Sequence, residues 1–563
     1  MHFGFTLLDW LVLAGYLVGI TVFGLWMARR VRSSGSYFLG ERKLPWWVMV
    51  GQAFGTGTSA EMPVAQCGAV YAGGFGTIWY QWKNMLITPF YWLLSPWYRR
   101  SERTTVAEMV SDRYGHGAAL MYTMFAVFYL VLTQGVLLKG AGKAISVATG
   151  GELISPNGVV LAMTVAFILY SFMGGLISSA YTDFVQSLLI IVLSFMLIPL
   201  GLHAVHGMSG MRQTLPEHFF RVYSAASNLD AFTIAMLALN GLAGIVAQPI
   251  ILSCTATGKS ERAGRIGQTY GSMIKRFCTI GWALTGLIVA AMVIQRGVTL
   301  PDKEAAFGFA CRELLCPGLI GLMVACVLAA NMSTCSNLMV NTGALFAGSI
   351  YREYFNPTAN DRRILLVGRL SGLALTVLGI LFALIVDQVL DAFLFTETVS
   401  AFMGIMILGG ILWRRANRYG ACVGVMISVA AYYFLNYRQC GGHLQLVYPW
   451  LAAPFGWSML IGFAVLIAVS LMTGPEPEGM IEHFFDNMNR STDREGLPDG
   501  HPRPLAAKLG QDLLFLDLTG WFKRQRWTGF WSRYREDIAG FAAAWGAVAF
   551  TVFCAWALML IGR

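Results

Sequence analysis

The chain has 563 residues, of which 56% are hydrophobic and only 12% are charged, and its net charge is +10. This composition is too apolar for a set of soluble domains. A basic charge would suggest nucleic acid as the partner of a soluble protein, but in a chain this apolar it reports membrane orientation instead. The sequence therefore predicts a polytopic membrane protein.

Apolar runs of about 20 residues recur from one end of the chain to the other, and each is long enough to cross a hydrocarbon core as a helix. We predict about 14 transmembrane helices. They lie near residues 6–28, 45–71, 76–98, 117–149, 157–178, 181–205, 229–255, 274–295, 316–349, 366–388, 391–413, 419–436, 448–473 and 537–561.

The distribution of Lys and Arg residues predicts the orientation of these spans. If the N-terminus is extracytoplasmic, the inner loops hold 29 of the 40 Lys and Arg residues, beginning with Arg29, Arg30 and Arg32. Because positive residues concentrate on the cytoplasmic side, both termini are predicted to be extracytoplasmic. The first span is read as a retained helix, and the expected location is the plasma (inner) membrane.

Two spans are interrupted in the same way, one at Gly55–Pro63 and the other at Gly241–Pro249. Such paired breaks leave backbone carbonyls without helical partners, and they mark transporter binding sites. Each break opens a set of five spans, which predicts two inverted repeats over residues 45–206 and 207–415. The other predicted units are a first helix and cytoplasmic loop (1–44), two peripheral helices (416–473), a cytoplasmic linker (474–536) and a C-terminal helix (537–563).

Short motifs spread along residues 5–473 carry a family resemblance. The strongest is Gly174-Gly175-Leu176 followed by Thr182-Asp183 and Gln186; others are Tyr37-Phe38-Leu39-Gly40, Ser59-Ala60-Glu61, Thr105-Val106-Ala107-Glu108-Met109, Met332-Ser333-Thr334 and Gly409-Gly410-Ile411-Leu412-Trp413-Arg414-Arg415. As an ordered set they resemble the sodium/solute symporter family of sugar, proline and sialic acid carriers. The resemblance implies an all-α polytopic fold with a LeuT-like five-plus-five inverted-repeat core.

The resemblance also implies a sodium site between the first break and the ninth span. Its ligands would be the carbonyls of Gly55, Thr58 and Ala330 and the hydroxyls of Ser333 and Thr334. A hard cation prefers such oxygen ligands. The alternative for the two hydroxyls is a hydrogen bond to the preceding helical turn.

A second sodium site is implied for some family members around the residue that matches Asp183. The matching positions one turn along the ninth span are Ser336 and Asn337, and the asparagine departs from the hydroxyl found in those members. An ionised carboxylate inside a membrane needs a cation nearby. The number of sodium ions per transport cycle, one or two, is therefore left open.

The solute site is expected beside the breaks, and the resemblance assigns it residues from several spans. They are Glu61, Met62, Gln81 and Gln248, with Thr396 and Glu397 as additions. Lys139 of the fourth span is a further candidate, because an intramembrane cation could meet a substrate carboxylate. A neutral amide such as Gln81 suits several ligand groups, although a helix–helix hydrogen bond is its alternative. For the intramembrane lysines, pairing with an acid, for example of Lys83 with Glu61 or Glu397, is as good an interpretation as ligand binding; Lys143 is expected to snorkel outward.

Together these features predict a sodium-coupled symporter that imports a small polar organic solute (a sugar, an amino acid or another carboxylate) by alternating access. Sodium is the expected coupling ion, and no other metal, cofactor or nucleic acid is expected. A proton-coupled carrier and a solute sensor built on the same fold are the alternatives. An enzyme is not expected, because the eight His residues fall in predicted loops or near span ends and no CxxC motif is present. Cys311 and Cys316 share an outward loop, and whether they form a disulfide is left open.

Overall fold

The computed structural model describes residues 5–29, 37–38, 40–150, 156–223, 229–492, 513–522 and 524–562. In these residues the fold is all-helical, apart from one isolated bridge between Leu44 and Gly258. Part of the predicted cytoplasmic linker, residues 493–512, lies outside the described residues, as does Leu39 of the motif at Tyr37.

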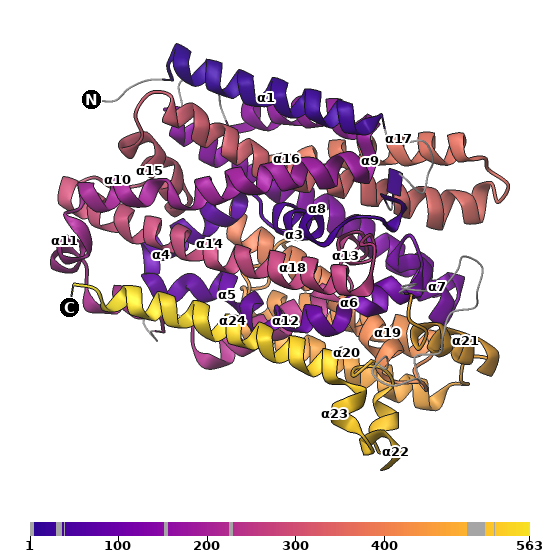
Figure 1. The fold of residues 1–563 in the computed structure, drawn as a ribbon. Coiled ribbons are helices and arrows are strands. Elements are labelled where there is room, and N and C mark those ends of the chain that lie inside the picture. Colours follow the sequence, from indigo (N-terminus) through magenta and orange to yellow (C-terminus); the bar gives the residue numbers. More distant parts are fainter. Residues whose placement is uncertain are drawn as a thin grey trace.

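The helices form a bundle in which the longest ones run roughly parallel to one axis, side by side (Figure 1). In chain order they are α1 (Leu7–Ala28), α3 (Trp46–Thr56), α4 (Glu61–Gly73), α5 (Trp79–Ile87), α6 (Phe90–Ser101), α8 (His116–Ala148), α9 (Pro156–Phe195), α10 (Leu197–Ala204), α12 (Ala231–Ile245), α13 (Ile250–Thr255), α14 (Glu261–Arg296), α16 (Leu319–Ala344) continued by the π-helix η6 (Leu345–Phe355), α17 (Asp361–Ile385), α18 (Val389–Leu412), α19 (Arg418–Gln439), α20 (Ala452–Met472) and α24 (Arg535–Leu560). Shorter elements connect them: η1 (Gly40–Arg42), η2 (Phe75–Ile78), α7 (Val106–Tyr114), α11 (Gly207–Thr214), η3 (Glu217–Phe220), η5 (Lys303–Ala305), α15 (Ala306–Leu314), α21 (Glu478–Met488), η7 (Leu518–Phe522), α22 (Arg524–Trp527) and α23 (Phe530–Arg533).

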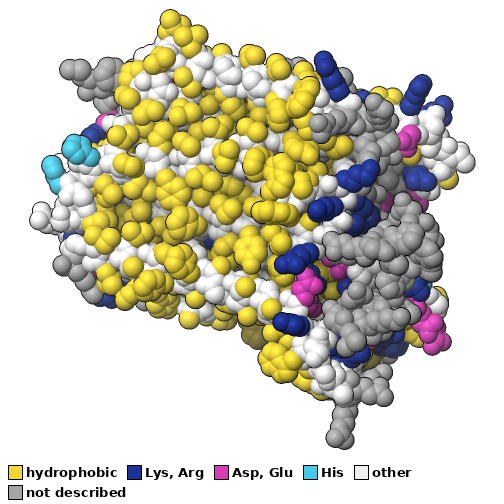
Figure 2. Space-filling model, viewed as in Figure 1, with side chains coloured by type: hydrophobic (Ala, Val, Ile, Leu, Met, Phe, Trp, Pro, Cys, Tyr) yellow, Lys and Arg dark blue, Asp and Glu magenta, His cyan; other side chains and the backbone are white. Residues whose placement is uncertain are grey.

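The surface and interior of this bundle fit a membrane protein. Apolar side chains cover a broad band of the surface, and Lys and Arg gather at one end of it (Figure 2). Among the described residues, ten helices are long and apolar enough to span a membrane. In α14 and α16, 89% of the most apolar window is buried, compared with 22% in α1, so α14 and α16 form the core and α1 lies at the periphery.

The predicted fifth and sixth spans meet at a backbone irregularity inside α9. Gly175 has φ 52° and ψ −157°, which ends one helix and starts the next. A Cβ on this residue would lie 2.7 Å from the carbonyl oxygen of Tyr37, so the close approach also requires glycine. The Gly-Gly motif therefore marks the sharp turn between two spans, as the sequence predicts.

The helix of the predicted eighth span starts 13 residues before the predicted boundary of 274, at Glu261. Ser260 caps its N-terminus by accepting a hydrogen bond from the Ala263 N–H at 3.1 Å. Gly267 and Gly271 allow the polar first half to pack against α3, since a Cβ on Gly271 would lie 2.6 Å from the Val50 carbonyl oxygen. This segment is therefore buried in the bundle and is not a loop.

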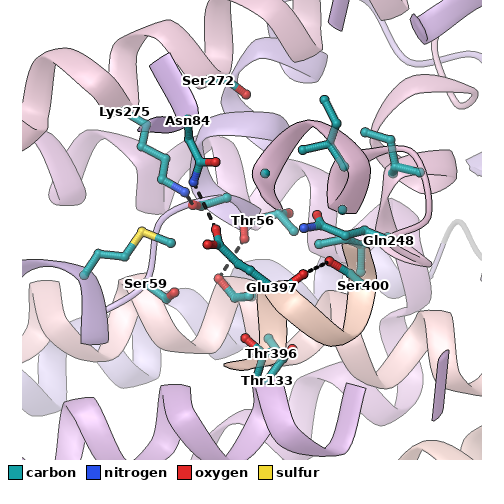
Figure 3. Close-up of a pocket in the computed structure, with 18 of the residues that line it drawn as sticks. Thr56, Ser59, Asn84, Thr133, Gln248, Ser272, Lys275, Thr396, Glu397 and Ser400 are labelled. Carbon is teal, nitrogen blue, oxygen red and sulfur yellow. Dashed lines mark hydrogen bonds between the residues drawn. The ribbon is translucent and has the colours of Figure 1, made fainter. Parts of the chain in front are cut away.

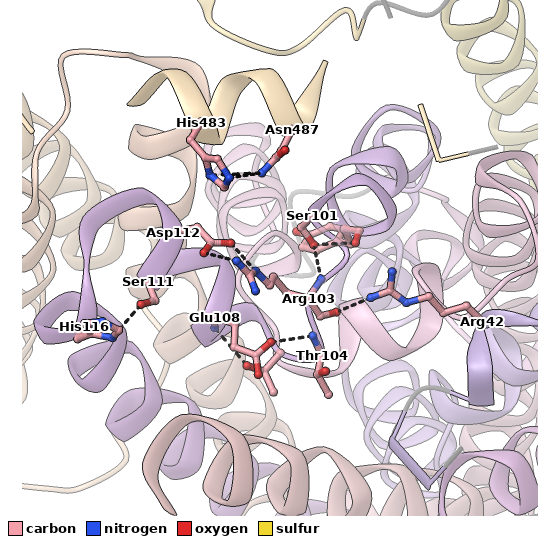
Figure 4. Close-up of polar contacts among 12 residues, drawn as sticks. Arg42, Ser101, Arg103, Thr104, Glu108, Ser111, Asp112, His116, His483 and Asn487 are labelled. Carbon is pink, nitrogen blue, oxygen red and sulfur yellow. Dashed lines mark hydrogen bonds and ion pairs between the residues drawn. The ribbon is translucent and has the colours of Figure 1, made fainter. Parts of the chain in front are cut away.

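The basic end of the bundle lies opposite the end where α1 begins and α24 ends (Figures 1 and 2). Polar contacts fix the connection between α6 and α8 at this end (Figure 4). Arg103 binds both carboxylate oxygens of Asp112, at 2.6 and 2.7 Å, and Glu108 accepts the Thr104 N–H at 2.9 Å. Burial raises the pKa of Glu108 above its ordinary value, although the backbone N–H of Thr104 and the charge of Arg103 act to lower it.

Candidate functional site

The first break separates α3, which ends at Thr56, from α4, which begins at Glu61. Two of its carbonyls accept hydrogen bonds from side chains of other helices. The Thr334 hydroxyl of α16 donates to the Thr56 carbonyl at 3.0 Å, and the Lys275 ammonium of α14 donates to the Gly57 carbonyl. Asn331 accepts the Ala60 N–H at 2.8 Å, so the break is held mainly by α16 and α14.

The second break separates α12, which ends at Ile245, from α13, which begins at Ile250. Its carbonyls are bound by two tyrosines. The Tyr98 hydroxyl of α6 donates to the Val246 carbonyl at 2.7 Å, and the Tyr122 hydroxyl of α8 donates to the Ala247 carbonyl at 2.6 Å. Both tyrosines are fully buried.

Buried hydroxyls surround the contact between the first break and α16. Thr334 also approaches the Ala330 carbonyl, at 3.3 Å, so it bridges its own helix and the break. The hydroxyl oxygens of Thr58 and Ser333 are buried, and neither has a hydrogen-bond partner among the described residues. Buried polar atoms of this kind call for a ligand or a water molecule.

Asp183 lies next to the same break, on the half of α9 that follows Gly175. Its Oδ2 accepts hydrogen bonds from the Asn337 amide at 2.7 Å and the Thr56 hydroxyl at 3.1 Å. The amide of Asn337 also reaches the Ser179 hydroxyl at 2.8 Å. Within the described part of the chain, Asp183 Oδ1 and the Ser336 hydroxyl have no partner. The structure thus brings the candidates for the second sodium site together.

A cavity lies between the two breaks and encloses about 1000 Å³ of empty space, including the part that opens to solvent. Side chains from α3, α4, α5, α6, α8, α12, α13, α14, α16 and α18 line it (Figure 3). Of the predicted solute residues, Glu61, Met62, Gln248, Thr396 and Glu397 belong to the lining. The cavity therefore joins the two breaks, as expected for a substrate site of this architecture.

Gln81 and Lys139, the other two predicted solute residues, lie outside the lining of this cavity as the described residues define it. Gln81 is buried on α5, and its backbone carbonyl lies 3.5 Å from the Arg276 guanidinium. Lys139 is half-buried on α8. Neither position has a direct path to a solute in this arrangement of the helices.

Glu397 of α18 is already held by two side chains of α5. The Lys83 ammonium forms an ion pair with Glu397 Oε2. The Asn84 amide donates to Oε1 at 3.0 Å (Figure 3). Of the two acids considered for Lys83, the structure thus selects Glu397. Because a buried charge needs such partners, this pair ties α5 to α18 as well as lining the cavity.

Sequence reasoning missed several lining residues, of which the most important are Lys275 and Arg276. Both residues lie at the edge of the predicted eighth span, where basic residues usually anchor a helix at the membrane interface. The early start of α14 places them deep in the bundle instead. The small residues Gly264, Gly267 and Gly271, at helical spacing, were the available signal that the helix begins earlier. The other missed polar residues of the lining are Thr56, Ser59, Asn84, Thr133, Asn240, Gln268, Ser272 and Ser400.

A second ion-pair cluster lies at the end of the bundle opposite the basic end. The Lys143 ammonium of α8 contacts Asp302 at 3.0 Å and Glu304 at 2.5 Å. Glu304 also accepts the backbone N–H groups of Val389 at 2.9 Å and Leu390 at 3.1 Å, at the start of α18. Lys143 is thus paired and does not snorkel alone. This group, the Lys143 cluster, joins α8 to the start of α18.

The two cysteines of the same connection do not pair in the described structure. Cys311 is buried on α15, Cys316 is exposed in the turn after it, and both are free.

The cavity between two broken helices and the helical bundle around it define a secondary transporter of the broken-helix class. The model of the sodium:solute symporter family matches residues 37–428. The chain belongs to this family: it is a sodium-coupled solute symporter and not an enzyme. The family resemblance seen in the sequence is thereby confirmed.

Individual relatives are distant. The chain is 26% identical over 437 residues to the osmoregulated proline transporter OpuE of Bacillus subtilis (strain 168), covering 74% of this chain and 86% of that one. It is 22% identical over 524 residues to the sodium/glucose cotransporter of Vibrio parahaemolyticus, covering 85% and 93%. Identities this low leave the solute open.

Among solved structures, a sodium-coupled sialic acid symporter in a substrate-bound outward-open state has a TM-score of 0.70. It is 18% identical, and the match covers 84% of this chain and 99% of that one. This likeness confirms the predicted LeuT-like, all-helical fold.

Proposed function

We propose that the chain imports a small polar organic solute together with sodium by alternating access, and that the solute binds in the cavity between the two breaks. The observation that carries this proposal is the cluster of unpaired buried oxygens beside the first break. Such oxygens are costly unless an ion or water occupies them. Because the break also contributes Ser59, Glu61 and Met62 to the cavity, an ion bound there would order the solute site.

In this proposal sodium binds the carbonyls of Gly55, Thr58 and Ala330 and the hydroxyls of Ser333 and Thr334. Two observations support the choice. The Ser333 hydroxyl has no hydrogen-bond partner in the described residues, and Thr334 already joins α16 to the break through the Thr56 carbonyl at 3.0 Å. An ion at this point would couple the half-helices α3 and α4 to the core helix α16.

A second sodium would bind Asp183, Ser336 and Asn337 on the other side of Thr56. The free Oδ1 of Asp183 and the free Ser336 hydroxyl, both without partners within the described ranges, support this assignment. Two ions would roughly double the free energy available for accumulation, since each charge that crosses about 100 mV contributes about 2.3 kcal/mol.

We further propose that the basic end is cytoplasmic, that both termini are extracytoplasmic and that the protein resides in the plasma (inner) membrane. Lys and Arg gather at this end, in keeping with the positive-inside rule (Figure 2). The cavity lining includes Cys254, Gln268 and Ser272, whereas no residue of the Lys143 cluster belongs to it as the described residues define it.

The sodium assignment is tested by the thermal stability of the purified protein in sodium and in potassium. Wild-type protein should be stabilised by sodium, and the double variant Ser333→Ala/Thr334→Ala should require about 10-fold or more sodium for the same stabilisation, because each lost hydrogen-bonding ligand costs about 1 kcal/mol. Thr342→Ala is the matched control, since this buried hydroxyl of α16 donates only to the Leu338 carbonyl of its own helix, at 2.9 Å. Stabilisation that ignores the cation in wild-type protein would contradict the sodium site and favour proton coupling.

A further inference from the structure

The charges in the cavity lining and directly behind it do not balance. Four charged residues belong to the lining: Glu61, Lys275, Arg276 and Glu397. Glu397 is paired with Lys83, which stands just behind it. Glu61 accepts a hydrogen bond from Ser59 at 2.6 Å and has Lys275 as its neighbouring cation. With Lys83 counted, three cations face two acids, so one positive charge is in excess. Lys83 forms an ion pair and Lys275 donates to the Gly57 carbonyl, whereas the contacts of Arg276 are weaker.

Arg276 is buried and poorly satisfied. Its side chain is 4% exposed, and its Nε has no hydrogen-bond partner among the described residues. One terminal nitrogen reaches the Gln81 carbonyl at the outer limit of hydrogen bonding, 3.5 Å. Asp183, the other buried acid near the first break, is bound to Asn337 and Thr56 and does not line the cavity. Among the described residues no acid forms an ion pair with Arg276; Glu397, which is already paired with Lys83, acts on its charge only from a greater distance.

An unpaired guanidinium at membrane depth is costly, and such charges face cavities where they meet an opposite charge. A guanidinium offers parallel N–H donors that match the two oxygens of a carboxylate. Around it the cavity presents uncharged hydrogen-bonding groups, among them Asn84, Asn240 and Thr133. These groups suit hydroxyl or carbonyl oxygens on the rest of a solute.

We propose that the transported solute is a small organic anion whose carboxylate binds Arg276, with hydroxyl or carbonyl groups bound by the polar lining, as in a sugar acid or a hydroxy acid. This inference rests on the proposed function of the cavity and deepens it. A solute with one net negative charge removes the charge imbalance of the cavity, and a neutral sugar leaves it in place.

The test compares matched acid and neutral probes on the purified full-length protein in sodium and in potassium. The pairs are gluconate and glucitol, glucuronate and glucose, and lactate and propane-1,2-diol, and binding is measured as the concentration dependence of the thermal shift. The variants are Arg276→Gln, which removes the charge, and Arg276→Lys, which keeps it. Arg262→Gln is the control, because Arg262 lies exposed on the same helix outside the cavity.

An acid of these pairs is expected to bind more tightly than its neutral partner, in sodium only. Arg276→Gln should weaken acid binding at least tenfold, Arg276→Lys should restore part of it, and Arg262→Gln should leave it unchanged. Without solute, Arg276→Gln should melt at the same or a higher temperature than wild type, because an uncompensated charge has been removed; a lower melting temperature would assign Arg276 a structural role and overturn the proposal.

Two other results separate the proposals. Tighter sodium-dependent binding of the neutral partners, or acid binding that is unchanged in Arg276→Gln, overturns the anion assignment and leaves sodium-coupled transport standing. Acid binding that depends on Arg276 but is equal in sodium and potassium supports the anion site and overturns sodium coupling.

Discussion

At the first break, between α3 and α4, backbone carbonyls meet a threonine hydroxyl and a lysine ammonium, whereas at the second, between α12 and α13, they meet two tyrosine hydroxyls. The first break is also surrounded by buried oxygens that lack partners among the described residues, and it has the carboxylate of Asp183 beside it. The tyrosine hydroxyls at the second break are neutral donors, and rigid aromatic rings hold them in place. Two breaks with the same cause in the sequence thus have different chemistry in the fold.

This difference separates two uses of a helix break. Carbonyls that are fully satisfied by neutral donors stabilise one backbone conformation and have little left to offer a cation. Carbonyls next to unpaired oxygens and a carboxylate can bind one, because a hard cation needs several oxygen ligands. This difference supports the proposal that the first break binds the ion, while the second break contributes Gln248 to the wall of the cavity.

The largest expected effect follows from removing the carboxylate at the first break. Asp183→Asn keeps the shape of the side chain but removes its charge. At 4 Å and an effective dielectric constant of about 20, one charge pair is worth about 4 kcal/mol, so we expect the sodium concentration for half-maximal uptake to rise about 1000-fold. Sodium-dependent uptake into proteoliposomes measures this.

The control for this variant is Asp9→Asn. Asp9 is a fully buried carboxylate of α1 that accepts the Gly318 and Gly321 N–H groups, both at 2.7 Å, far from both breaks. The Asp9→Asn substitution should lower the stability of the protein and leave the sodium requirement unchanged. If Asp183→Asn leaves the sodium requirement unchanged, the charge of Asp183 does not account for ion binding at the first break.

The second break should respond in the opposite way. Tyr98→Phe and Tyr122→Phe each leave a buried carbonyl without its donor, which costs about 1 to 3 kcal/mol of stability. The sodium requirement should not change, because both proposed sodium sites lie at the first break. Tyr432→Phe is the matched control, since this buried hydroxyl has no partner in the described part of the chain and its removal should be neutral or stabilising. A shifted sodium requirement in Tyr98→Phe or Tyr122→Phe would show that both breaks bind the ion.

The sequence predicts the helices and both breaks, because hydropathy, Gly and Pro report these features locally. The meeting of the first break with the ninth span was implied by the family resemblance. The sequence does not reveal that Tyr98 and Tyr122 satisfy the second break, since such contacts join residues more than 100 positions apart. The sequence also places Lys275 and Arg276 at the edge of a span. The first half of α14 is polar, so hydropathy does not assign it to the helix, and its burial against α3 becomes visible only in the structure. Gln81 and Lys139 lie outside the cavity lining for a related reason. The sequence places a residue on one side of a helix, but it does not show which neighbouring helix or cavity that side faces.

The smallest effect concerns α4, the half-helix that follows the first break. α4 packs under the Lys143 cluster, since a Cβ on Gly68 would lie 2.7 Å from the Lys303 carbonyl oxygen. In that cluster, partial burial alone would raise the pKa of Asp302, but the Glu304 N–H and the Lys143 ammonium outweigh it and hold the pKa below its ordinary value. A lowered pKa means that the contact contributes stability above the usual Asp pKa of about 3.9 and loses it as the pH falls through the lowered value.

Asp302→Asn should therefore destabilise the protein by less than about 1 kcal/mol, because Asp302 is partly exposed and such ion pairs are weak. The difference from wild type should stay constant between about pH 8 and pH 5 and shrink below about pH 4. Thermal melts across this range measure it, with Asp230→Asn as an exposed helix cap distant from the cluster. A difference that instead grows on acidification would mean that Asp302 is protonated in the folded state and that the Lys143 cluster does not hold α4 through this charge.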